Sequence, residues 1–383
     1  MTSFLGLGLL FLSLICLGTW PALLRLGSFG GERNLCHVYV DYSTAYFLVS
    51  SLPYLWTRPS ASPLTTPMIG VAMLGGSLLS AGNLSMQWAT TVYRAPLTTV
   101  LALQASLTVF LGTSLNYCIE PHKTPHPQYL VVGVVVFWVA IFLATRAQLL
   151  HGRQQSRSDR SVGVEMETQY GSHHQQQDQD DSNTNNNSKV ESWNTNTPYD
   201  PVSMSEHAFD PKDQHTTQGV LVAAAGGLCF GFFSPAFNIA VNDPFGNAAT
   251  ASPSRVVEAN MWFSLAFWLA SILGNTILLR AGDDSIFTIW KEYVQQSGLY
   301  QRRLALISGV VCAAGNILQF QGGQLVGYAT ADLVQAYPIV SIWWDMHLFG
   351  EFRQASHRLI GLLVGMYVAY LSGIVLLAKS SME

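Results

Sequence analysis

Long apolar runs separated by short polar stretches recur along most of the chain. A helix needs about 20 apolar residues to cross the hydrocarbon core of a bilayer. Runs of that length lie near residues 3–25, 38–57, 68–90, 95–118, 129–149, 218–241, 257–280, 303–326, 328–349 and 358–379. The pattern predicts an all-α polytopic membrane protein with ten transmembrane helices.

A long polar segment divides these helices into two groups of five. Residues 150–217 include "HHQQQDQDDSNTNNNSK" and have almost no apolar side chains. Such a segment cannot bury a core, so we expect it to be disordered. The predicted organisation is a first five-helix repeat at residues 1–149, a disordered loop at 150–217 and a second five-helix repeat at 218–383.

The basic residues predict the orientation of the chain. Fifteen of the 19 Lys and Arg residues fall in loops after the odd-numbered predicted helices, and four fall on the other side. Basic residues concentrate in cytoplasmic loops. We therefore expect both termini to be extracytoplasmic and the central loop to be cytosolic.

The two halves share short sequences in the same order. "CLGTW-PA" at 16–22 matches "CFGFFSPA" at 229–236, and "SAGNLSMQ" at 80–87 matches "AAGNILQF" at 313–320. Gln104 likewise has a counterpart 231 residues later, Gln335. Equivalent helices are five spans apart, an odd number, so the halves cross the membrane in opposite senses. An inverted repeat of this kind usually binds its substrate near the midplane, between the halves.

Amide side chains fall on narrow faces of the predicted helices. At 100° per residue, Asn83 and Gln87 share one face of the third helix, and Asn316 and Gln319 share one face of the eighth. Gln104 lies on a polar face of the fourth. These faces favour a shared substrate cavity. Amide residues also hold transmembrane helices together by hydrogen bonding, and that alternative stays open.

Two further glutamines complete the predicted polar set. Gln335 shares a stripe of the ninth helix with Asp332. Gln321 points away from the polar face of the eighth helix, unless Gly322 and Gly323 break that helix and turn it inward. We include both as candidate substrate-binding residues.

Three aromatic residues lie beside or one residue from prolines within apolar runs. They are Trp20, Phe233 and Tyr337. Proline kinks a helix and frees a backbone carbonyl. An aromatic ring at such a kink usually packs against its neighbours, and in an amide-lined cavity it can also stack on a flat substrate.

Asp332 is the sharpest candidate for proton coupling. A carboxylate at the bilayer centre costs about 2.5–3.5 kcal/mol on insertion scales and commonly marks an ion or proton pathway. The alternative is a structural pair or a helix cap. Asp41 is a second candidate, although Tyr39 and Tyr42 beside it indicate a position near the membrane surface.

Composition excludes several other classes of protein. The chain is 49% hydrophobic and 11% charged, against roughly 25% charged residues in a soluble domain. The net charge of −4, with no basic cluster, excludes nucleic acid as a partner. No phosphate-binding loop, metal-ligand spacing or intramembrane-protease motif occurs, so we expect no direct use of ATP, no cofactor and no enzymatic activity. Ten helices in two repeats do not suit a seven-helix receptor.

Several of these stretches resemble the ureide permeases of plants, within the drug/metabolite transporter superfamily. The resemblance lies in "CLGTWPALLRL", "VYVDYSTAY", "LSAGNLSMQWA", "FSPAFNIAVNDPF" and "GNILQFQGGQLVGYATADLVQAYPIVS". It covers both membrane halves and excludes the central loop. In the plant pattern a glutamate stands near the position of Leu101, which is a departure here.

The resemblance implies ten helices in an inverted repeat and proton-coupled import of oxo derivatives of nitrogen heterocycles, such as allantoin and uracil. Import of this kind places the protein in the plasma membrane. Such substrates are flat neutral rings whose edges alternate N–H and C=O, and each Asn or Gln amide can match those edges without charge. A sugar or nucleotide-sugar carrier of the same superfamily is the alternative, and nucleotide sugars would require basic residues facing the cavity.

Overall fold

The structure is a computed structural model whose regular elements are all helical within the residues that it describes. The described residues are 2–28, 34–56, 63–93, 97–151, 214–244, 253–280, 285–295, 298–350, 352 and 355–382. Seven of the described helices are long and apolar enough to cross a membrane. The predicted total of ten stays a prediction, and most of the loop expected to be disordered lies outside the described residues.

The helices of the two halves follow the apolar runs closely. In the first half they are α1 (Thr2–Ser28), α2 (Leu35–Trp56), α3 (Thr66–Gln87), the π-helical turn η1 (Trp88–Val92), α4 (Leu97–Ile119), the short η2 (Pro121–Lys123) and a helix over Pro127–His151. In the second half they are α6 (Gln214–Asn242), α7 (Pro253–Arg280), the short α8 (Ile286–Gln295), α9 (Leu299–Val326) and α12 (His357–Ser380).

The expected single helix over 328–349 is wrong. The structure has three pieces there, namely α10 (Tyr328–Ala331), the 3₁₀ helix η3 (Asp332–Ala336) and α11 (Pro338–Leu348). Gly327 ends α9 with φ 95°, a conformation that glycine adopts without steric cost. Pro338 then starts a new helix, where its missing N–H is tolerated. Asp332 and Gln335 therefore lie in a 3₁₀ turn and not on one stripe of a continuous α-helix.

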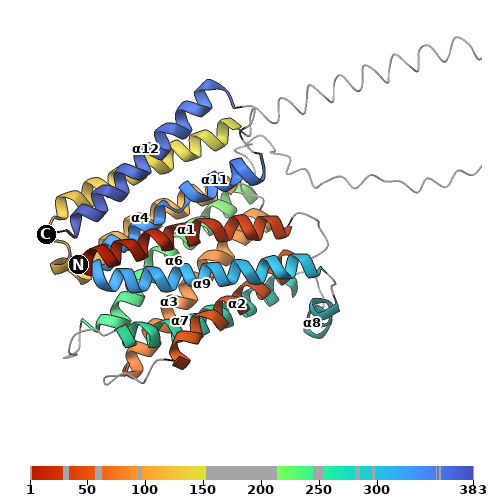
Figure 1. Cartoon of the computed structure of the whole chain (residues 1–383). Helices are drawn as coiled ribbons and strands as arrows, with labels where there is room; N and C mark the ends of the chain where they lie inside the picture. The colour runs from red at the N-terminus through yellow and green to blue at the C-terminus, as the bar shows by residue number, and fades with distance from the viewer. Residues whose placement is uncertain are drawn as a thin grey trace, which may run out of the picture.

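α1 and α9 lie side by side in opposite directions (Figure 1). Ser13 Oγ donates to the carbonyl of Gly315 at 2.7 Å, and Ser308 Oγ donates to the carbonyl of Trp20 at 2.8 Å. The N-terminus of α1 thus meets the end of α9, where both chain termini also lie. We call this the termini end of the bundle and the opposite one the central-loop end.

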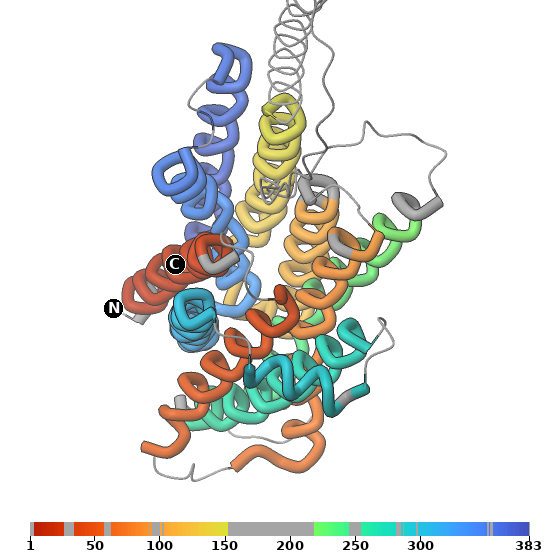
Figure 2. The backbone as a smooth tube through the Cα atoms, turned by 90° about the vertical axis from the view of Figure 1, so that its right-hand side faces the viewer, coloured from red at the N-terminus to blue at the C-terminus, as the bar shows by residue number. Residues whose placement is uncertain are grey.

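The remaining contacts interleave the two halves. α3 packs on α6 and α7, α4 packs on α6, and α2 packs on α7 and α9; Figure 2 shows the interleaving from a second direction. Glycines permit the closest approaches. A methyl group on Gly76 of α3 would collide with the carbonyl of Phe263 in α7, and one on Gly309 of α9 would collide with the carbonyl of Tyr42 in α2.

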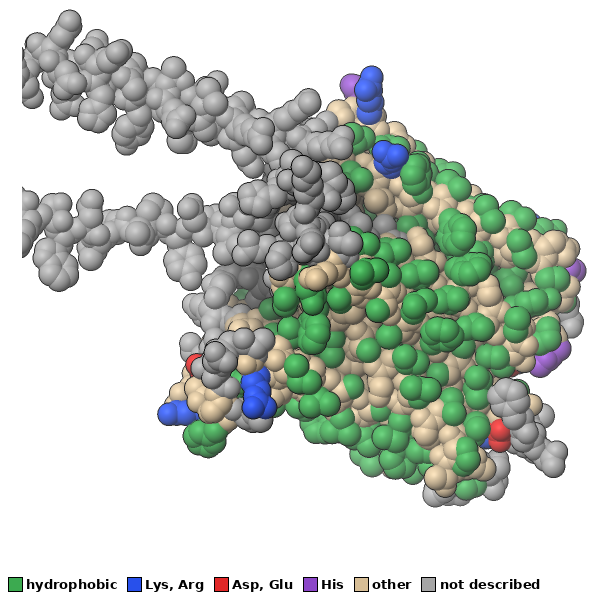
Figure 3. All heavy atoms as spheres, turned by 180° about the vertical axis from the view of Figure 1, so that it is seen from behind, with side chains coloured by type: hydrophobic (Ala, Val, Ile, Leu, Met, Phe, Trp, Pro, Cys, Tyr) green, Lys and Arg blue, Asp and Glu red, His purple; other side chains and the backbone are tan. Residues whose placement is uncertain are grey.

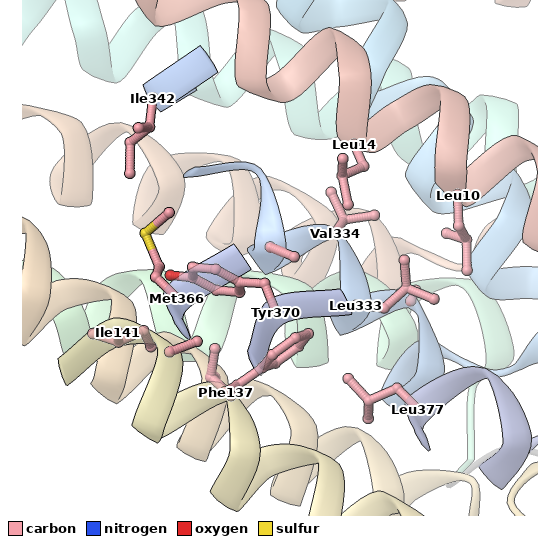
Figure 4. Packing of buried hydrophobic residues seen from close by; sticks show 14 of the residues in the cluster. Leu10, Leu14, Phe137, Ile141, Leu333, Val334, Ile342, Met366, Tyr370 and Leu377 are labelled. Carbon is pink, nitrogen blue, oxygen red and sulfur yellow. The ribbon is translucent and has the colours of Figure 1, made fainter. Parts of the chain in front are cut away.

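An apolar cluster holds η3 between α1 and the paired helices α12 and Pro127–His151 (Figure 4). Leu10 of α1, Leu333 of η3 and Phe137 are each at most 4% exposed. Gly373 of α12 lies against the ring of Phe137, which brings these two helices close. Burial of this surface stabilises the broken segment that carries Asp332.

The outer surface is apolar over most of its area. Figure 3 shows hydrophobic side chains across the visible face, with basic side chains near its edges. Among the exposed apolar residues are Val131, Val368 and Leu273, each more than half exposed. A continuous apolar surface of this size is far larger than a soluble monomer tolerates and suits contact with lipid chains.

Candidate functional site

Asp332 is a buried carboxylate at the break between α9 and α11. Its side chain is 1% exposed. It lies against α4 at Gly112, where an added Cβ atom would be 3.4 Å from Asp332 Oδ2. The carboxylate therefore packs directly against α4.

Asn116 of α4 forms hydrogen bonds both to Asp332 and to two residues of α6. Its Nδ2 atom donates to Ser234 Oγ at 2.9 Å and to Asp332 Oδ2 at 3.3 Å. Its Oδ1 atom accepts from Asn238 Nδ2 at 3.1 Å. Asn116 and Asn238 are fully buried. These three bonds fix the orientation of the amide and direct its N–H groups toward the carboxylate.

The hydrogen bonds continue from Asn116 to the termini end. Asn242 Nδ2 donates to Asn238 Oδ1 at 2.6 Å, and Gln324 Nε2 donates to Asn242 Oδ1 at 3.3 Å. We call Asn116, Asn238, Asn242 and Gln324 the amide chain. A buried amide is costly unless it is hydrogen-bonded. The bonds of the amide chain satisfy the buried side chains of Asn116 and Asn238.

A basic side chain lies at the outer end of the amide chain. Lys123 Nζ donates to the backbone carbonyl of Gln324 at 2.9 Å and pairs with Glu120 at the same distance. The amide chain therefore extends from Asp332 to a charged pair at the termini end.

Among the predicted amides of α3 and α4, Gln104 contacts α3 through Ser85. Gln104 Nε2 donates to Ser85 Oγ at 3.0 Å. Asn83 and Gln87 of α3 are both buried. The Oε1 atom of Gln104 is buried and has no hydrogen-bond partner among the described residues.

The predicted amides of α9 face a different helix. Asn316 Nδ2 donates to Tyr46 Oη of α2 at 2.9 Å. Gln319 is buried, and its Nε2 atom has no partner within the described residues. No hydrogen bond between described residues joins these amides to those of α3 and α4. Their contribution to one shared cavity therefore stays a prediction.

The two further glutamines occupy different surroundings. α9 runs unbroken through Gly322 and Gly323, so the condition that would turn Gln321 inward is not met. Gln321 lines a small cavity with Asn260 of α7 and Pro53 of α2. Gln335 is half-buried in η3.

The three aromatic candidates pack against their neighbours. Trp20 stacks on Tyr42 with 5.1 Å between ring centroids. Phe233 is 4% exposed and lies 6.3 Å from the ring of Phe263. Tyr337 caps the start of α11. A role of these rings in stacking on a substrate stays a prediction.

Asp41 lies at the central-loop end, far along the bundle from Asp332. It is 3% exposed and accepts from Tyr293 Oη of α8 at 2.5 Å. Arg302 Nε of α9 lies 3.4 Å from the same carboxylate oxygen. These contacts tie α2 to α8 and α9. They are those of a structural ion pair, and the predicted part of Asp41 in proton coupling is untested.

Sequence reasoning missed Asn116, the hydrogen-bond partner of Asp332, and the polar residues of α6 that continue from it. Ser234, Asn238 and Asn242 follow one another at four-residue spacing along α6, which is the signal of a polar helix face. Asn116 lies in "GTSLNY", where no repeat match drew attention to it. Within the described part of the chain, no group of three or more His, Cys, Asp or Glu residues is placed to hold a metal ion.

Comparison with known proteins identifies one family. The family model described as "Ureide permease" matches residues 60–380. Ureide permease 5 of Arabidopsis thaliana is 33% identical over 392 residues, covering 98% of this chain and 94% of that protein. Ureide permease 4 of the same plant is 33% identical, covering 98% and 97%. The probable ureide permease A3 of Vigna unguiculata is 30% identical, covering 91% and 96%.

Proposed function

The chain belongs to the ureide permease family, an integral membrane transporter family, and we propose that it imports ureides and related oxo nitrogen heterocycles, such as allantoin and uracil, together with protons. The resemblance predicted from sequence is thereby confirmed at the level of the family. The sugar and nucleotide-sugar alternative has no support from these relatives.

The buried carboxylate of Asp332 carries the proposal of proton coupling. It is 1% exposed and receives one amide N–H bond from Asn116 at 3.3 Å, and no basic group pairs with it among the described residues. A carboxylate in such surroundings can take up and release a proton when water reaches it. Its charge would then depend on the side of the membrane to which the site is open.

The amides support the choice of substrate class. A ureide ring presents N–H donors and C=O acceptors along one plane. The unpaired Oε1 of Gln104 and Nε2 of Gln319 supply one acceptor and one donor that lack partners in the described chain. Buried polar atoms without partners are costly, and a substrate with the complementary edge would satisfy them.

Packing supports an inverted repeat as the basis of alternating access. Leu17 and Phe230 are equivalent in the repeat alignment, as are Gly315 and Gly82. Gly315 of α9 lies against Leu17 of α1, and Gly82 of α3 lies against Phe230 of α6. The same contact thus occurs once between each pair of antiparallel helices. Two halves joined in this way can exchange conformations about a central site.

Uptake of labelled allantoin and uracil by cells expressing the protein tests this function. We expect uptake to rise as the external pH falls and to collapse when a protonophore dissipates the gradient. Asp332→Asn should abolish the pH dependence, because the amide cannot titrate. Surface expression of each variant, measured by biotinylation, serves as the control.

Two outcomes would contradict separate parts of the proposal. Uptake that ignores both pH and the protonophore would remove the proton coupling and leave the substrate class. Saturable uptake of a sugar with none of either ureide or uracil would overturn the substrate class. The orientation toward import from outside the cell, across the plasma membrane, is part of the same proposal.

A further inference from the structure

The last two turns of α6 follow a proline inside the helix. Pro235 lacks an N–H, so the carbonyl of Gly231 loses its helical hydrogen bond, and the helix is weakened at that point. We call residues 236–242 the hinged segment. It is the part of α6 that reaches the termini end.

The hinged segment lies across the polar path from Asp332 to the termini end. Phe237 stacks on Phe320 of α9, with ring centroids 3.6 Å apart and an interplanar angle of 9°. Asn238 donates to Asn116 of α4, and Asn242 accepts from Gln324 of α9. The ring of Phe237 also contacts the rings of Phe263 and Tyr328, and Ala240 and Val241 are fully buried. Apolar packing therefore holds the segment together with a few neutral hydrogen bonds, which are individually weak.

The opposite end of the molecule has a matching arrangement. In α1, Pro21 occupies the repeat position of Pro235, and the first polar residue after it is Arg25. Arg25 pairs with Asp345 of α11 at 2.9 Å. In α6 the first polar residue after the proline is Asn238, which binds Asn116 of α4. Each half thus has a helix that continues beyond a proline. A polar side chain on that end contacts a residue of the other half of the chain.

We propose that Asn116 is a positioning residue for Asp332, which holds the carboxylate with its N–H group and holds the hinged segment closed with its carbonyl oxygen. When the hinged segment swings away at Pro235, the Asn238–Asn116 bond breaks and water from the termini end reaches Asp332. The inference rests on the proposed function and adds the residue that links proton access to a helix movement.

The charges around this path leave Asp332 as its central titratable group. Gln218–Asn242 of α6 contains no Asp, Glu, Lys or Arg, and η3 contains only Asp332. Directly after α4, Glu120 follows Asn116 by four residues and pairs with Lys123. In α1, Arg25 lies at the other end of the bundle. In α12, His357 and Arg358 lie at its start and Lys379 near its end.

The pH profile of uptake gives the first test. We expect Asn116→Leu to move the midpoint of the profile to higher pH by about one unit, because the donor that favours the ionised carboxylate is lost. Asn275→Leu is the matched control, since Asn275 is a fully buried amide that donates only to Ser271 of its own helix. In an Asp332→Asn chain, Asn116→Leu should change the profile no further. Equal profiles for Asn116→Leu and Asn275→Leu would overturn the positioning role.

Thiol labelling gives a second test that needs no substrate. Ser234 lies beside Asn116, on the inner side of the hinged segment, and is 2% exposed. In a Cys118→Ser chain, we expect Ser234→Cys to react with a charged, membrane-impermeant thiol reagent applied from the termini end. Lys123→Ala should raise the rate several-fold, because it removes the bond that holds Gln324. Phe232→Cys, on the outer face of the same helix, is the control and should stay unreactive.

The two tests separate the inference from the proposed function. Failure of Ser234→Cys to react from the termini end, with or without Lys123→Ala, would overturn the opening of the hinged segment even if wild-type uptake depends on pH. Labelling that occurs at equal rates in Ser234→Cys and Phe232→Cys would also overturn it. Labelling as expected in a protein that transports no ureide would sustain the movement and reject the proposed substrates.

Discussion

At the scale of single residues, hydrogen-bond and ion-pair partners distinguish side chains that look alike in the sequence and are equally buried. Asp332 and Asp41 are both acidic residues in apolar runs, yet Asp41 accepts a bond from Tyr293 and lies beside Arg302, whereas Asp332 has an amide as its partner. The difference makes Asp332 the better candidate for carrying a proton.

The amides of α9 give a prediction about substrate affinity. Asn316→Ala and Gln319→Ala should each raise the KM for ureide uptake by about 2- to 10-fold, because a neutral hydrogen bond contributes about 0.5–1.5 kcal/mol. Gln321→Ala is the comparison, since Gln321 lines the small cavity between α2 and α7. Concentration-dependent uptake at fixed pH measures the three values. A larger effect for Gln321→Ala than for Gln319→Ala would contradict the assignment.

At the scale of helices, glycines decide how closely the two halves approach. Gly76 and Gly309 are repeat equivalents, separated by 233 residues like the "AGN" matches, and each lies against a backbone carbonyl of another helix. A small residue at such a contact lets backbones pack at short distance.

Substitution of these glycines should destabilise the bundle. Gly76→Ala and Gly309→Ala should each lower the free energy of unfolding by about 1–3 kcal/mol, as overpacking does. Gly70→Ala on α3 is the matched control, because an added Cβ atom there meets nothing within 4 Å. Thermal unfolding of the purified protein in detergent measures the difference. Equal unfolding temperatures for Gly70→Ala and Gly76→Ala would show that the close approach does not matter.

At the scale of the whole molecule, the ion pairs lie at the two ends of the bundle and the apolar surface lies between them. Lys123 and Glu120 lie at the termini end, and the pairs Arg25–Asp345 and Arg302–Asp41 lie at the central-loop end. Between the ends, the surface is apolar (Figure 3). Because basic residues concentrate at the central-loop end, that end is predicted to face the cytosol.

Epitope tags test this orientation directly. A tag at either terminus should bind antibody on intact cells, and a tag inserted within residues 152–213 should bind only after permeabilisation. Both termini share one end of the bundle (Figure 1), so the two terminal tags should behave alike. Labelling of the central tag on intact cells would reverse the orientation, and with it the side from which Ser234→Cys is expected to react.

The sequence by itself indicated the all-helical class and the family, and it proposed the two acidic candidates. Apolar runs of membrane-crossing length, Gly and Pro positions and short repeated matches are local or periodic signals, so they can be recognised before folding. They failed at residues 328–349, where hydropathy is continuous but the backbone turns at Gly327, because hydropathy carries no information about dihedral angles.

Only the tertiary structure decided which polar side chains meet. Asn116 and Asn238 are 122 residues apart, and Asn116 and Asp332 are 216 apart, so no spacing rule connects them. Their contact depends on how α4, α6 and η3 pack around one another, and a hydrogen bond needs placement within a fraction of an ångström. The sequence supplied the polar residues, and the packing of the helices selected Asn116 as the partner of Asp332.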